Sequence, residues 1–368
     1  MSKENDRCKM KILLVSPLPN KYSFGGIASW TRRFVDGMAN DKNVDVMVVD
    51  ANPINKKGNN EFGLLGFIKK SFFNLRLISK VKKEIGIFKP DIVHLNTSCT
   101  PLACLRDFFI LRIARKRKKI CVLHCRCNVE DQITKSRVGF SIFKKNICRA
   151  SAVFVLNRRS FEFVGRCKDD SNSALFIIPN FIDESIVSNE KNINEDLKKA
   201  IFVGHLVKNK GIDEIIFLAT VFPGVHFEIV SSFMRDYPNG DVFPTNVSVT
   251  GKLSQESVIK ELDGADAFLF PSHSEGFSNA LLEAMARGVP AIATDVGANL
   301  EMLENRGGFT FKTGDKSEVR EKFAALFKQK TREDMSSWNI KKVKNSYVSG
   351  VVLKRIIDVY SLLLEKHE

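Results

Sequence analysis

The stretch SEGFSNALLEAMARGVPAIATDVGA, residues 274–298, shows the succession of helix and strand on which the fold is built. Ser278 can cap a helix, because its side-chain oxygen can accept a hydrogen bond from a backbone N–H of the first turn. The helix NALLEAMAR leads to Gly288, a residue suited to the left-handed position after a helix, and Pro290 prevents its continuation. A short apolar run, AIATD, follows directly. This order of helix, stop and strand predicts a parallel β-sheet covered by helices.

The same alternation of apolar runs and helical patterns extends along the chain. Continuous apolar runs, rather than alternating ones, indicate strands that are buried on both faces. The expected strands form two series, at 12–16, 44–49, 91–96, 120–125, 152–157 and 175–180, and at 200–205, 226–231, 246–251, 267–272, 291–295 and 308–311. The sequence therefore predicts an α/β protein with two Rossmann-like, doubly wound parallel sheets. Ligands of such sheets bind beyond the carboxyl ends of the strands, so the default site is a cleft between two facing sheets.

The chain of 368 residues suits two domains, and its 44% apolar content suffices for two cores. The polar segment 183–199 is the best linker candidate. We expect an N-terminal domain at 1–183, a C-terminal domain at 184–345 and a C-terminal helix within 346–368, where residues 352–367 are strongly amphipathic.

The N-terminal region and the cysteines indicate a cytoplasmic protein. The first apolar run ends at a proline after about seven residues, which indicates a strand rather than a signal peptide. No stretch approaches the roughly 18 apolar residues of a membrane span. Eight cysteines at irregular spacings favour a reduced compartment. The cluster of Cys121, His124, Cys125 and Cys127 allows a zinc site, but no second pair stands at metal-ligand spacing, so buried strand cysteines are favoured.

The positive charge is concentrated in the first half. Residues 1–180 hold 34 Lys and Arg against 15 Asp and Glu, a net charge of +19, whereas the remainder holds 23 against 27, a net charge of −4. This asymmetry indicates an anionic partner such as lipid headgroups, a phosphorylated lipid or nucleic acid, with general solubility as the alternative. Residues 112–119 form a basic block. Residues 67–83 mix large apolar and cationic residues at helical spacing, which favours a helix on a membrane surface over an ordinary helix covering a sheet.

Two carboxylates mark a candidate site within the opening stretch. Glu275 lies in the turn before the helix, and Glu283 lies inside it. Ser278 or Asn279 caps this helix, and the free N–H groups of residues 277–279 form an anion site. Carboxylates on either side can accept hydrogen bonds from hydroxyl groups. The segment thus suits a nucleotide sugar, with phosphate in the middle and hydroxyls at both ends. Spacing alone equally allows two solvated charges at a helix end.

The segment EGFSNALLE resembles the Glu-x7-Glu motif of the family-4 glycosyltransferases, which have the GT-B fold. Further segments are similar to that family in order along the chain, at 23–30, 91–96, 178–183, 202–216 and 246–254. Together they are spread over most of the sequence. The resemblance implies two domains that face each other across a cleft, and a C-terminal helix that crosses back onto the first domain.

The resemblance also implies a role for each matching residue. Glu275 would bind the hydroxyls of the donor sugar, Glu283 those of the ribose, and Lys210 the diphosphate. The other residues implied in donor binding lie in glycine-containing loops and at the helix terminus: Gly25, Gly26, Gly204, Gly251, Leu253, Gly276, Phe277, Ser278 and Asn279.

His124 matches the family's histidine near the reacting sugar and the acceptor, with a hydrogen-bonded core histidine as the alternative. Together with Glu275, Lys210 and His205 it forms the implied catalytic set. His205 stands where the family has an arginine. Histidine is charged only below about pH 6.5 and lacks the bidentate fork of arginine. Either diphosphate binding is weaker here, or Lys208 substitutes. A second departure, a cysteine after His124 where glycine is common, puts the acceptor side in doubt.

The reaction implied is transfer of a sugar from a nucleoside diphosphate to an acceptor hydroxyl, with retention at the anomeric carbon. No Asp-x-Asp occurs in the sequence, so we expect no metal and no cofactor. The expected co-substrate is a nucleoside-diphosphate sugar, with UDP as the expected nucleotide. The acceptor is expected to be an oligosaccharide or lipid-linked glycan in surface polysaccharide or lipopolysaccharide synthesis. The charged first half would hold the enzyme peripherally at the inner face of the plasma membrane.

Three other functions fit parts of the sequence. A GT-B nucleotide-sugar epimerase would use the same cleft without an acceptor, and an inactive GT-B scaffold would explain His205. A nucleic-acid-binding protein would use the basic block, but four Tyr and two Trp offer little base stacking. We therefore expect no nucleic acid partner.

Overall fold

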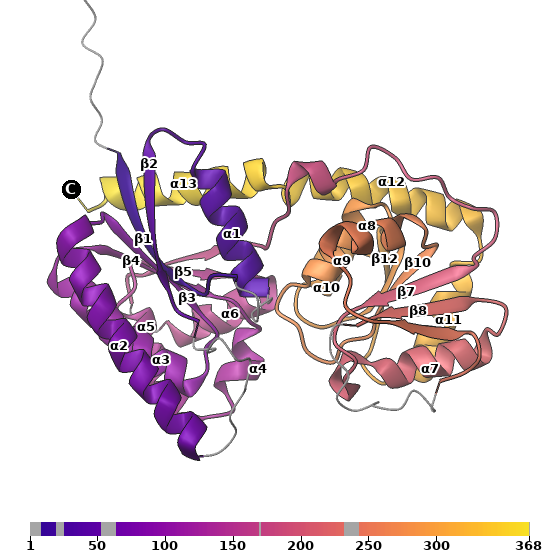
Figure 1. The fold of residues 1–368 in the computed structure, drawn as a ribbon, viewed down its shortest axis with the longest axis horizontal. Coiled ribbons are helices and arrows are strands. Elements are labelled where there is room, and N and C mark those ends of the chain that lie inside the picture. The colour runs from indigo at the N-terminus through magenta and orange to yellow at the C-terminus, as the bar shows by residue number, and fades with distance from the viewer. Residues whose placement is uncertain (1–8, 20–25, 53–63, 169–170, 232–242, 368) are drawn as a thin grey trace, which may run out of the picture. The chain divides into compact units, whose positions relative to one another are not determined.

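The computed structural model describes residues 9–19, 26–52, 64–168, 171–231 and 243–367 (Figure 1). The chain forms two compact units. The first consists of Met1–Pro179 together with Ser349–Glu368, and the second of Asn180–Val348. The polar segment 183–199 therefore lies inside the second unit, at its start, rather than between the two.

The first unit contains a six-stranded sheet in which all neighbouring strands are parallel. Its order is β2-β1-β3-β4-β5-β6. The strands are β1 (Met10–Ser16), β2 (Val44–Asp50), β3 (Ile92–Thr97), β4 (Ile120–Cys125), β5 (Ala152–Val155) and β6 (Ala174–Ile177). Strands β3, β4 and β5 are buried along their whole length, which accounts for their continuous apolar sequences.

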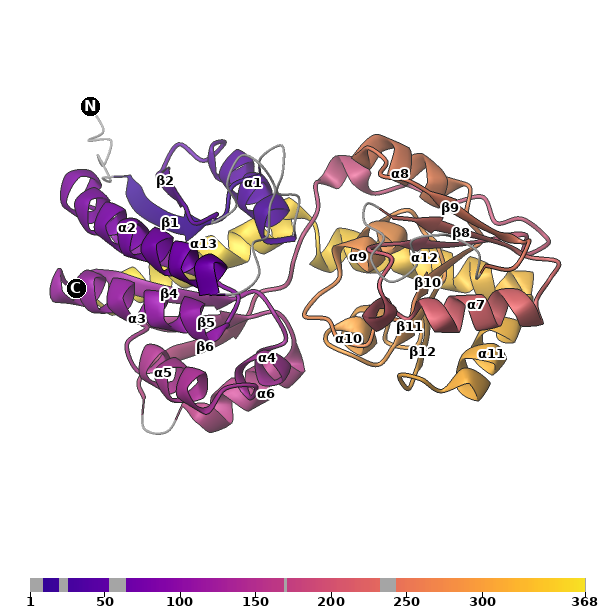
Figure 2. The same cartoon turned by 60° about the horizontal axis from the view of Figure 1, so that its bottom comes forward.

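Helices cover both faces of this sheet. One face lies under α2 (Leu64–Phe88), α3 (Pro101–Lys116), α4 (Val129–Ile133), α5 (Arg137–Ile147) and α6 (Arg158–Cys167), whose apolar residues join one core with the strands. The other face lies under α1 (Gly26–Met38) and α13 (Ser349–Glu365), which contact each other. Figure 2 shows α2, α3 and α5 beside one another on the first face.

Helix α13 brings the C-terminal segment into the first unit. Tyr360 is fully buried, stacks on Phe154 and forms a hydrogen bond with His94 of β3. Helices α1 and α13 approach closely because Gly37 has no side chain: a Cβ there would lie 2.2 Å from Cδ1 of Leu353. The second face of the sheet is thus completed by residues that lie far along the chain from the strands that they cover.

The second unit contains a second parallel six-stranded sheet, with the order β12-β11-β10-β7-β8-β9. Its strands are β7 (Lys199–Val203), β8 (His226–Val230), β9 (Val247–Thr250), β10 (Ala267–Phe270), β11 (Ala291–Thr294) and β12 (Gly308–Phe311). Its helices are the 3₁₀ helices η1 (Glu184–Ile186) and η2 (Lys208–Lys210) and the α-helices α7 (Ile212–Val221), α8 (Gln255–Asp263), α9 (Asn279–Ala286), α10 (Asn299–Leu303), α11 (Lys316–Ala325) and α12 (Gln329–Ser346).

The predicted fold class is confirmed. Each of the two series of apolar runs forms one parallel sheet, and the strands overlap the expected positions. Gly288 follows α9 with a φ of +70°, as expected of the residue that ends the helix. Within the described ranges, no helix is both long enough and apolar enough to cross a lipid bilayer.

Replacing Ile356 with Ala tests how strongly α13 stabilises the first unit. The side chain is fully buried, so the change should lower the free energy of unfolding of this unit by about 2–5 kcal/mol. Urea unfolding can be followed by the fluorescence of Trp30, which lies in the first unit, in a background where Trp338 is replaced by Phe. Val351→Ala on the same helix is the control, because Val351 is 42% exposed and should matter little. Equal effects of both changes would contradict a stabilising role of the buried face.

Candidate functional site

The site predicted around the Glu-x7-Glu segment lies at the carboxyl end of β10. Ser278 caps helix α9, since its hydroxyl accepts a hydrogen bond from the backbone N–H of Leu281 at 3.1 Å. Asn279 is the first helical residue instead. Its side-chain oxygen accepts from Asn180 at 2.9 Å, and Asn180 also donates to the carbonyl of Phe277 at 3.0 Å. Asn180 thus orients the turn that carries the predicted anion-binding amides, those of residues 277–279.

Glu275 of this turn forms an ion pair with Lys210 of η2. The Nζ of Lys210 contacts Oε1 of Glu275, and the hydroxyl of Ser272 donates to the same oxygen at 3.0 Å. Both charged side chains are mostly buried, at 23% exposure for Lys210 and 15% for Glu275. The structure therefore brings together the two residues expected to bind the diphosphate and the sugar. Within the pair, each charge partly neutralises the other.

Two glycines hold the backbone around this pair. Gly211 follows Lys210 with a φ of +74°, and a Cβ there would lie 2.1 Å from the carbonyl oxygen of Pro271. Gly297 has a φ of +58°, and its Cβ would lie 2.2 Å from the carbonyl oxygen of Glu275. Any other residue would have to push these loops apart. The close backbone contact fixes the loops that present Lys210 and Glu275.

His205 lies in the loop after β7, as Lys208 and Lys210 do. Partial burial of the ring, and then the nearby Lys210 cation, lower the pKa of His205 below its usual 6.5. The imidazole is consequently neutral at pH 7. The neighbouring Gly204 lies close to the ring of Phe202: a Cβ on Gly204 would lie 2.7 Å from Cζ of Phe202. The loop therefore carries two lysines and a histidine that becomes cationic only in acid or beside an anion.

Glu283 projects from α9 toward the start of α8. The amide of Gln255, the first residue of α8, donates to Oε1 of Glu283 at 3.4 Å. Gly251 and Leu253, the residues expected beside the nucleotide base, belong to the short loop that leads into α8. The structure thus connects the predicted base-binding loop with the predicted ribose-binding carboxylate through Gln255.

Sequence reasoning missed Asn180, Ser272 and Gln255. The first two lay within segments singled out by the resemblance or next to them, but nothing in the sequence shows which carboxylate or carbonyl they would contact. His273 was missed as well. Its Nε2 lies 3.0 Å from Oε1 of the buried Glu214 on α7, and its backbone N–H donates to Asn209 at 2.9 Å. These contacts join the Glu275 turn to the loop of Lys210.

In the first unit, His124 lies in a buried polar network. It is fully buried on β4, with Nε2 2.9 Å from the guanidinium of Arg126 and Nδ1 3.2 Å from Nε2 of His94. Because arginine can only donate, Nε2 of His124 accepts and its proton sits on Nδ1. Burial first, and Arg126 second, lower the pKa of His94 to about 3 and that of His124 well below 6.5. A ligand reaches the nitrogens of His124 only if Arg126 or His94 moves.

The remaining predicted residues of the first unit give little further information. Gly25 lies outside the described residues, and Gly26 is the first residue of α1. The seven cysteines in the described ranges form no disulfide, and Cys125 is buried. Among the residues that the structure describes, no group of three His, Cys, Asp or Glu side chains is placed to hold a metal ion.

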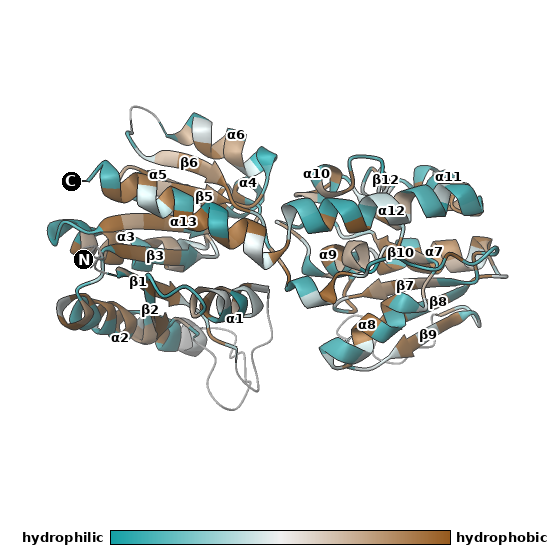
Figure 3. Cartoon of the chain, turned by 90° about the horizontal axis from the view of Figure 1, so that it is seen from above, coloured by the Kyte–Doolittle hydropathy of each residue, from teal (hydrophilic) through white to brown (hydrophobic). Residues whose placement is uncertain are grey.

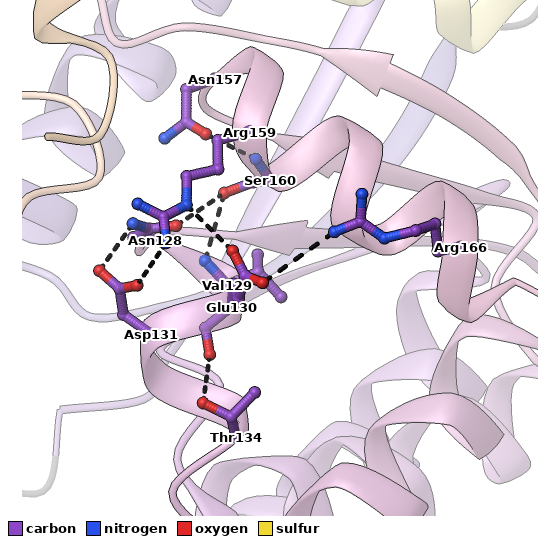
Figure 4. A network of polar contacts seen from close by, with 9 residues as sticks. All are labelled: Asn128, Val129, Glu130, Asp131, Thr134, Asn157, Arg159, Ser160 and Arg166. Atoms are coloured by element: carbon purple, nitrogen blue, oxygen red, sulfur yellow. Dashed lines mark hydrogen bonds and ion pairs between the residues drawn. The ribbon is translucent and has the colours of Figure 1, made fainter. Parts of the chain in front are cut away.

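A second polar cluster lies where α4 and α6 begin, just after the carboxyl ends of β4 and β5 (Figure 4). Asn157 caps α6 by accepting from the backbone of Ser160 at 2.7 Å. Ser160 accepts in turn from the N–H of Val129 at 3.2 Å, and Arg159 reaches Glu130 at 2.9 Å. The contacts hold the two helix starts together beyond the carboxyl ends of the strands, where ligands of parallel sheets generally bind.

Comparisons with known proteins match part of the second unit. Residues 242–342 match the model of the family described as "Glycosyl transferases group 1". A curated relative is the capsular polysaccharide biosynthesis glycosyltransferase CapM of Staphylococcus aureus, 29% identical over 177 residues, which are 45% of this chain and 47% of CapM. The chain spans about half the length of the first curated relatives that it matches.

Solved structures share the fold over nearly the whole chain. Sucrose-phosphate synthase from Thermosynechococcus elongatus has a TM-score of 0.77 at 15% identity and covers 97% of this chain and 100% of its own. HepE from Anabaena, solved with UDP and glucose, has a TM-score of 0.70 at 18% identity and covers 96% and 99%. At these identities the likeness concerns the fold, which is that of the GT-B glycosyltransferases.

The lowered pKa of His205 predicts how diphosphate binding depends on pH. A bound anion raises the pKa of the imidazole, so the affinity for UDP should increase as pH falls toward the pKa of the free protein. A charged hydrogen bond is worth about 1.5–3 kcal/mol, or roughly 10- to 100-fold in affinity. The His205→Arg variant should bind more tightly at pH 8 and lose this dependence. Calorimetry of both proteins from pH 8 to 5.5 tests this.

Protonation of UDP itself affects both proteins equally, so the ratio of their dissociation constants isolates the side chain. A ratio that does not change with pH would show that His205 does not interact with the diphosphate.

Proposed function

We propose that this protein is a retaining glycosyltransferase that moves a sugar from a nucleoside diphosphate to a hydroxyl of a glycan or lipid-linked acceptor. The observation that carries the proposal is the partly buried Lys210–Glu275 pair beside the start of α9. A cation and a carboxylate lie together here, next to the amides at the start of a helix. On a glycosyl diphosphate the cation can bind the diphosphate while the carboxylate binds hydroxyls of the sugar. The match of residues 242–342 to a glycosyltransferase family model supports this assignment.

The donor-binding roles follow from the chemistry of the contacts. Glu275 accepts hydrogen bonds from sugar hydroxyls, and Glu283, oriented by Gln255, accepts from the ribose. Lys210 and the amides of residues 277–279 bind the diphosphate, and Lys208 and His205 add positive charge when the anion is present. Departure of the diphosphate leaves negative charge on its oxygens, and these groups stabilise that charge without rearranging. Cationic side chains thereby do the work of a metal ion, and we propose a metal-independent reaction.

We assign acceptor binding to the first unit. The resemblance places His124 near the acceptor, whereas it gives Gly25 and Gly26, in the same half of the chain, a role in binding the donor. In the structure Nε2 of His124 contacts the guanidinium of Arg126, and we propose that His124 positions Arg126 and does not itself take a proton.

Assembly of a cell-surface polysaccharide is the pathway we propose, because CapM is named for capsule synthesis and the first half of the chain is strongly cationic. An acceptor on a lipid phosphate would be attracted to that charge. The protein would then work peripherally at the inner face of the plasma membrane, with UDP as the nucleotide.

A panel of UDP-, GDP- and ADP-sugars, added in the presence of a chelator, tests donor binding. A donor at a hundred times its dissociation constant should stabilise the second unit by about 2.7 kcal/mol, which appears as a shift in thermal unfolding. We expect a UDP-sugar to give this shift and Glu283→Ala to abolish it. A response only with added divalent metal would refute the metal-independent reaction. No response to any nucleotide would favour an inactive scaffold, and epimerised free donor would favour an epimerase.

The Lys210–Glu275 pair predicts a preference for the intact donor over its product. The diphosphate of free UDP attracts Lys210 and so leaves Glu275 without its cation. The sugar of a UDP-sugar instead offers hydroxyl groups to Glu275, which replace the lost contact with Lys210. Glu275→Gln removes this competition, so UDP should bind about tenfold more tightly and the UDP-sugar more weakly. Calorimetric titration of both ligands measures the change.

The matched control is Glu283→Gln, the same chemical change at the residue expected to contact the ribose that both ligands share. It should weaken both by the same factor. If Glu275→Gln also weakened UDP and UDP-sugar equally, the ion pair would not discriminate between them.

A further inference from the structure

The outer side of α2 carries an apolar stripe that has no place in the core. Leu77, Val81 and Ile85 on the inner side are buried against the sheet. On the opposite side Ile68, Phe72 and Leu75 are exposed by 53%, 55% and 62%. Their spacing of four and three residues places them in one row along the helix. The sequence 67–83 therefore forms a helix with two apolar sides, of which only one is used by the fold.

Helix α3 extends this surface. It contacts α2, and Figures 1 and 2 show the two helices beside each other. Leu105 and Phe109, one turn apart on α3, are each 41% exposed. Coloured by hydropathy, the ribbon of α2 shows brown segments along much of its length (Figure 3). Single exposed apolar residues are ordinary, but five on two adjacent helices form a patch.

Cations surround the apolar residues. The exposed charged residues of the two helices are all basic: Lys69, Lys70, Arg76, Lys80, Lys82 and Lys83 on α2, and Arg112, Arg115 and Lys116 on α3. The acidic residues of these helices are Glu84, half-buried, and Asp107, buried in an ion pair with Arg106. The guanidinium of Arg76 lies 4.5 Å above the ring of Phe72, so charge and apolar surface adjoin directly.

We propose that this surface of α2 and α3 docks onto a lipid bilayer that contains anionic headgroups. The row of Ile68, Phe72 and Leu75 faces directly away from the sheet, so it can enter the headgroup region while the lysines and arginines on its flanks meet phosphates. Each such cation contributes about 1 kcal/mol near an anionic membrane, and the apolar side chains add their burial. Binding to a nucleic acid would instead require the cations to occupy the most exposed row of the helix, and it would gain nothing from burying Ile68 and Leu75.

The docking surface goes beyond the proposed reaction and does not depend on it. It lies on helices of the first unit, whereas the donor groups Lys210 and Glu275 lie in the second. Docking would concentrate the enzyme where a lipid-linked acceptor is held. The two proposals can fail separately, because docking needs no nucleotide.

Flotation of the full-length protein with vesicles tests the surface. We expect binding to phosphatidylcholine vesicles that contain phosphatidylglycerol, little binding to phosphatidylcholine alone, and release by high salt. The variant Ile68→Ser, Phe72→Ser, Leu75→Ser should reduce the partition coefficient at least about tenfold, as should Lys80→Gln, Lys82→Gln, Lys83→Gln. Thermal unfolding and UDP binding of each variant confirm that it is folded.

The matched control is Val351→Ser, Leu362→Ser on α13, where two side chains of 42% and 40% exposure lie on the other face of the sheet. It should bind vesicles as the unchanged protein does. Failure of the unchanged protein to bind anionic vesicles, or equal binding by the Ile68, Phe72, Leu75 variant, would overturn the proposal. Binding to duplex DNA that is tighter than vesicle binding and is insensitive to this variant would also overturn it, in favour of a polyanion site.

Discussion

The ion pair between Lys210 and Glu275 is the interaction on which the candidate site depends. An ion pair at this depth gives little net stability, because both charges lose much of their hydration. Its geometry must therefore be imposed by the surrounding backbone, and two glycines in left-handed conformations do this by allowing the loops after β7, β10 and β11 to touch. Side-chain hydrogen bonds also hold these loops, from Ser272 to Glu275 and between His273 and Glu214. The site is thus built into the loops themselves, which hold together the two charges that the proposed donor would separate.

Most of the fold could be predicted because its causes are local. Buried parallel strands require continuous apolar runs, and the stop at Gly288 follows from the positive φ that the turn needs. Glu275 and Lys210 could be named from their segments, whereas their contact could not, since 65 residues separate them. Gln255 and Asn180 escaped for the same reason: an amide side chain shows its partner only once the chain is folded. His124 illustrates the opposite case. Its position on β4 was predictable, but its contacts with Arg126 and His94 depend on the pairing of β4 with β3 and on the turn after β4.

The uneven charge of the sequence has a definite place in the structure. Much of the excess of Lys and Arg in the first half lies on the exposed sides of α2 and α3, around apolar residues that the core does not use. The periodicity of residues 67–83 indicated an amphipathic helix but could not show that its apolar residues serve two surfaces at once. That distinction needs the burial of each side chain, which only the assembled sheet determines.

The division of the first unit into two stretches of chain affects how the protein can form during synthesis. Residues 1–179 emerge from the ribosome before the rest, yet, among the described helices, only α1 covers the sheet face that carries His94, His124 and Phe154 until α13 has been made. The second unit, which is one continuous stretch, can fold while that face is still open. The usual order, in which the N-terminal part of a chain finishes first, is therefore reversed. A nascent chain must keep a half-covered apolar sheet from associating with others for the time needed to translate the second unit.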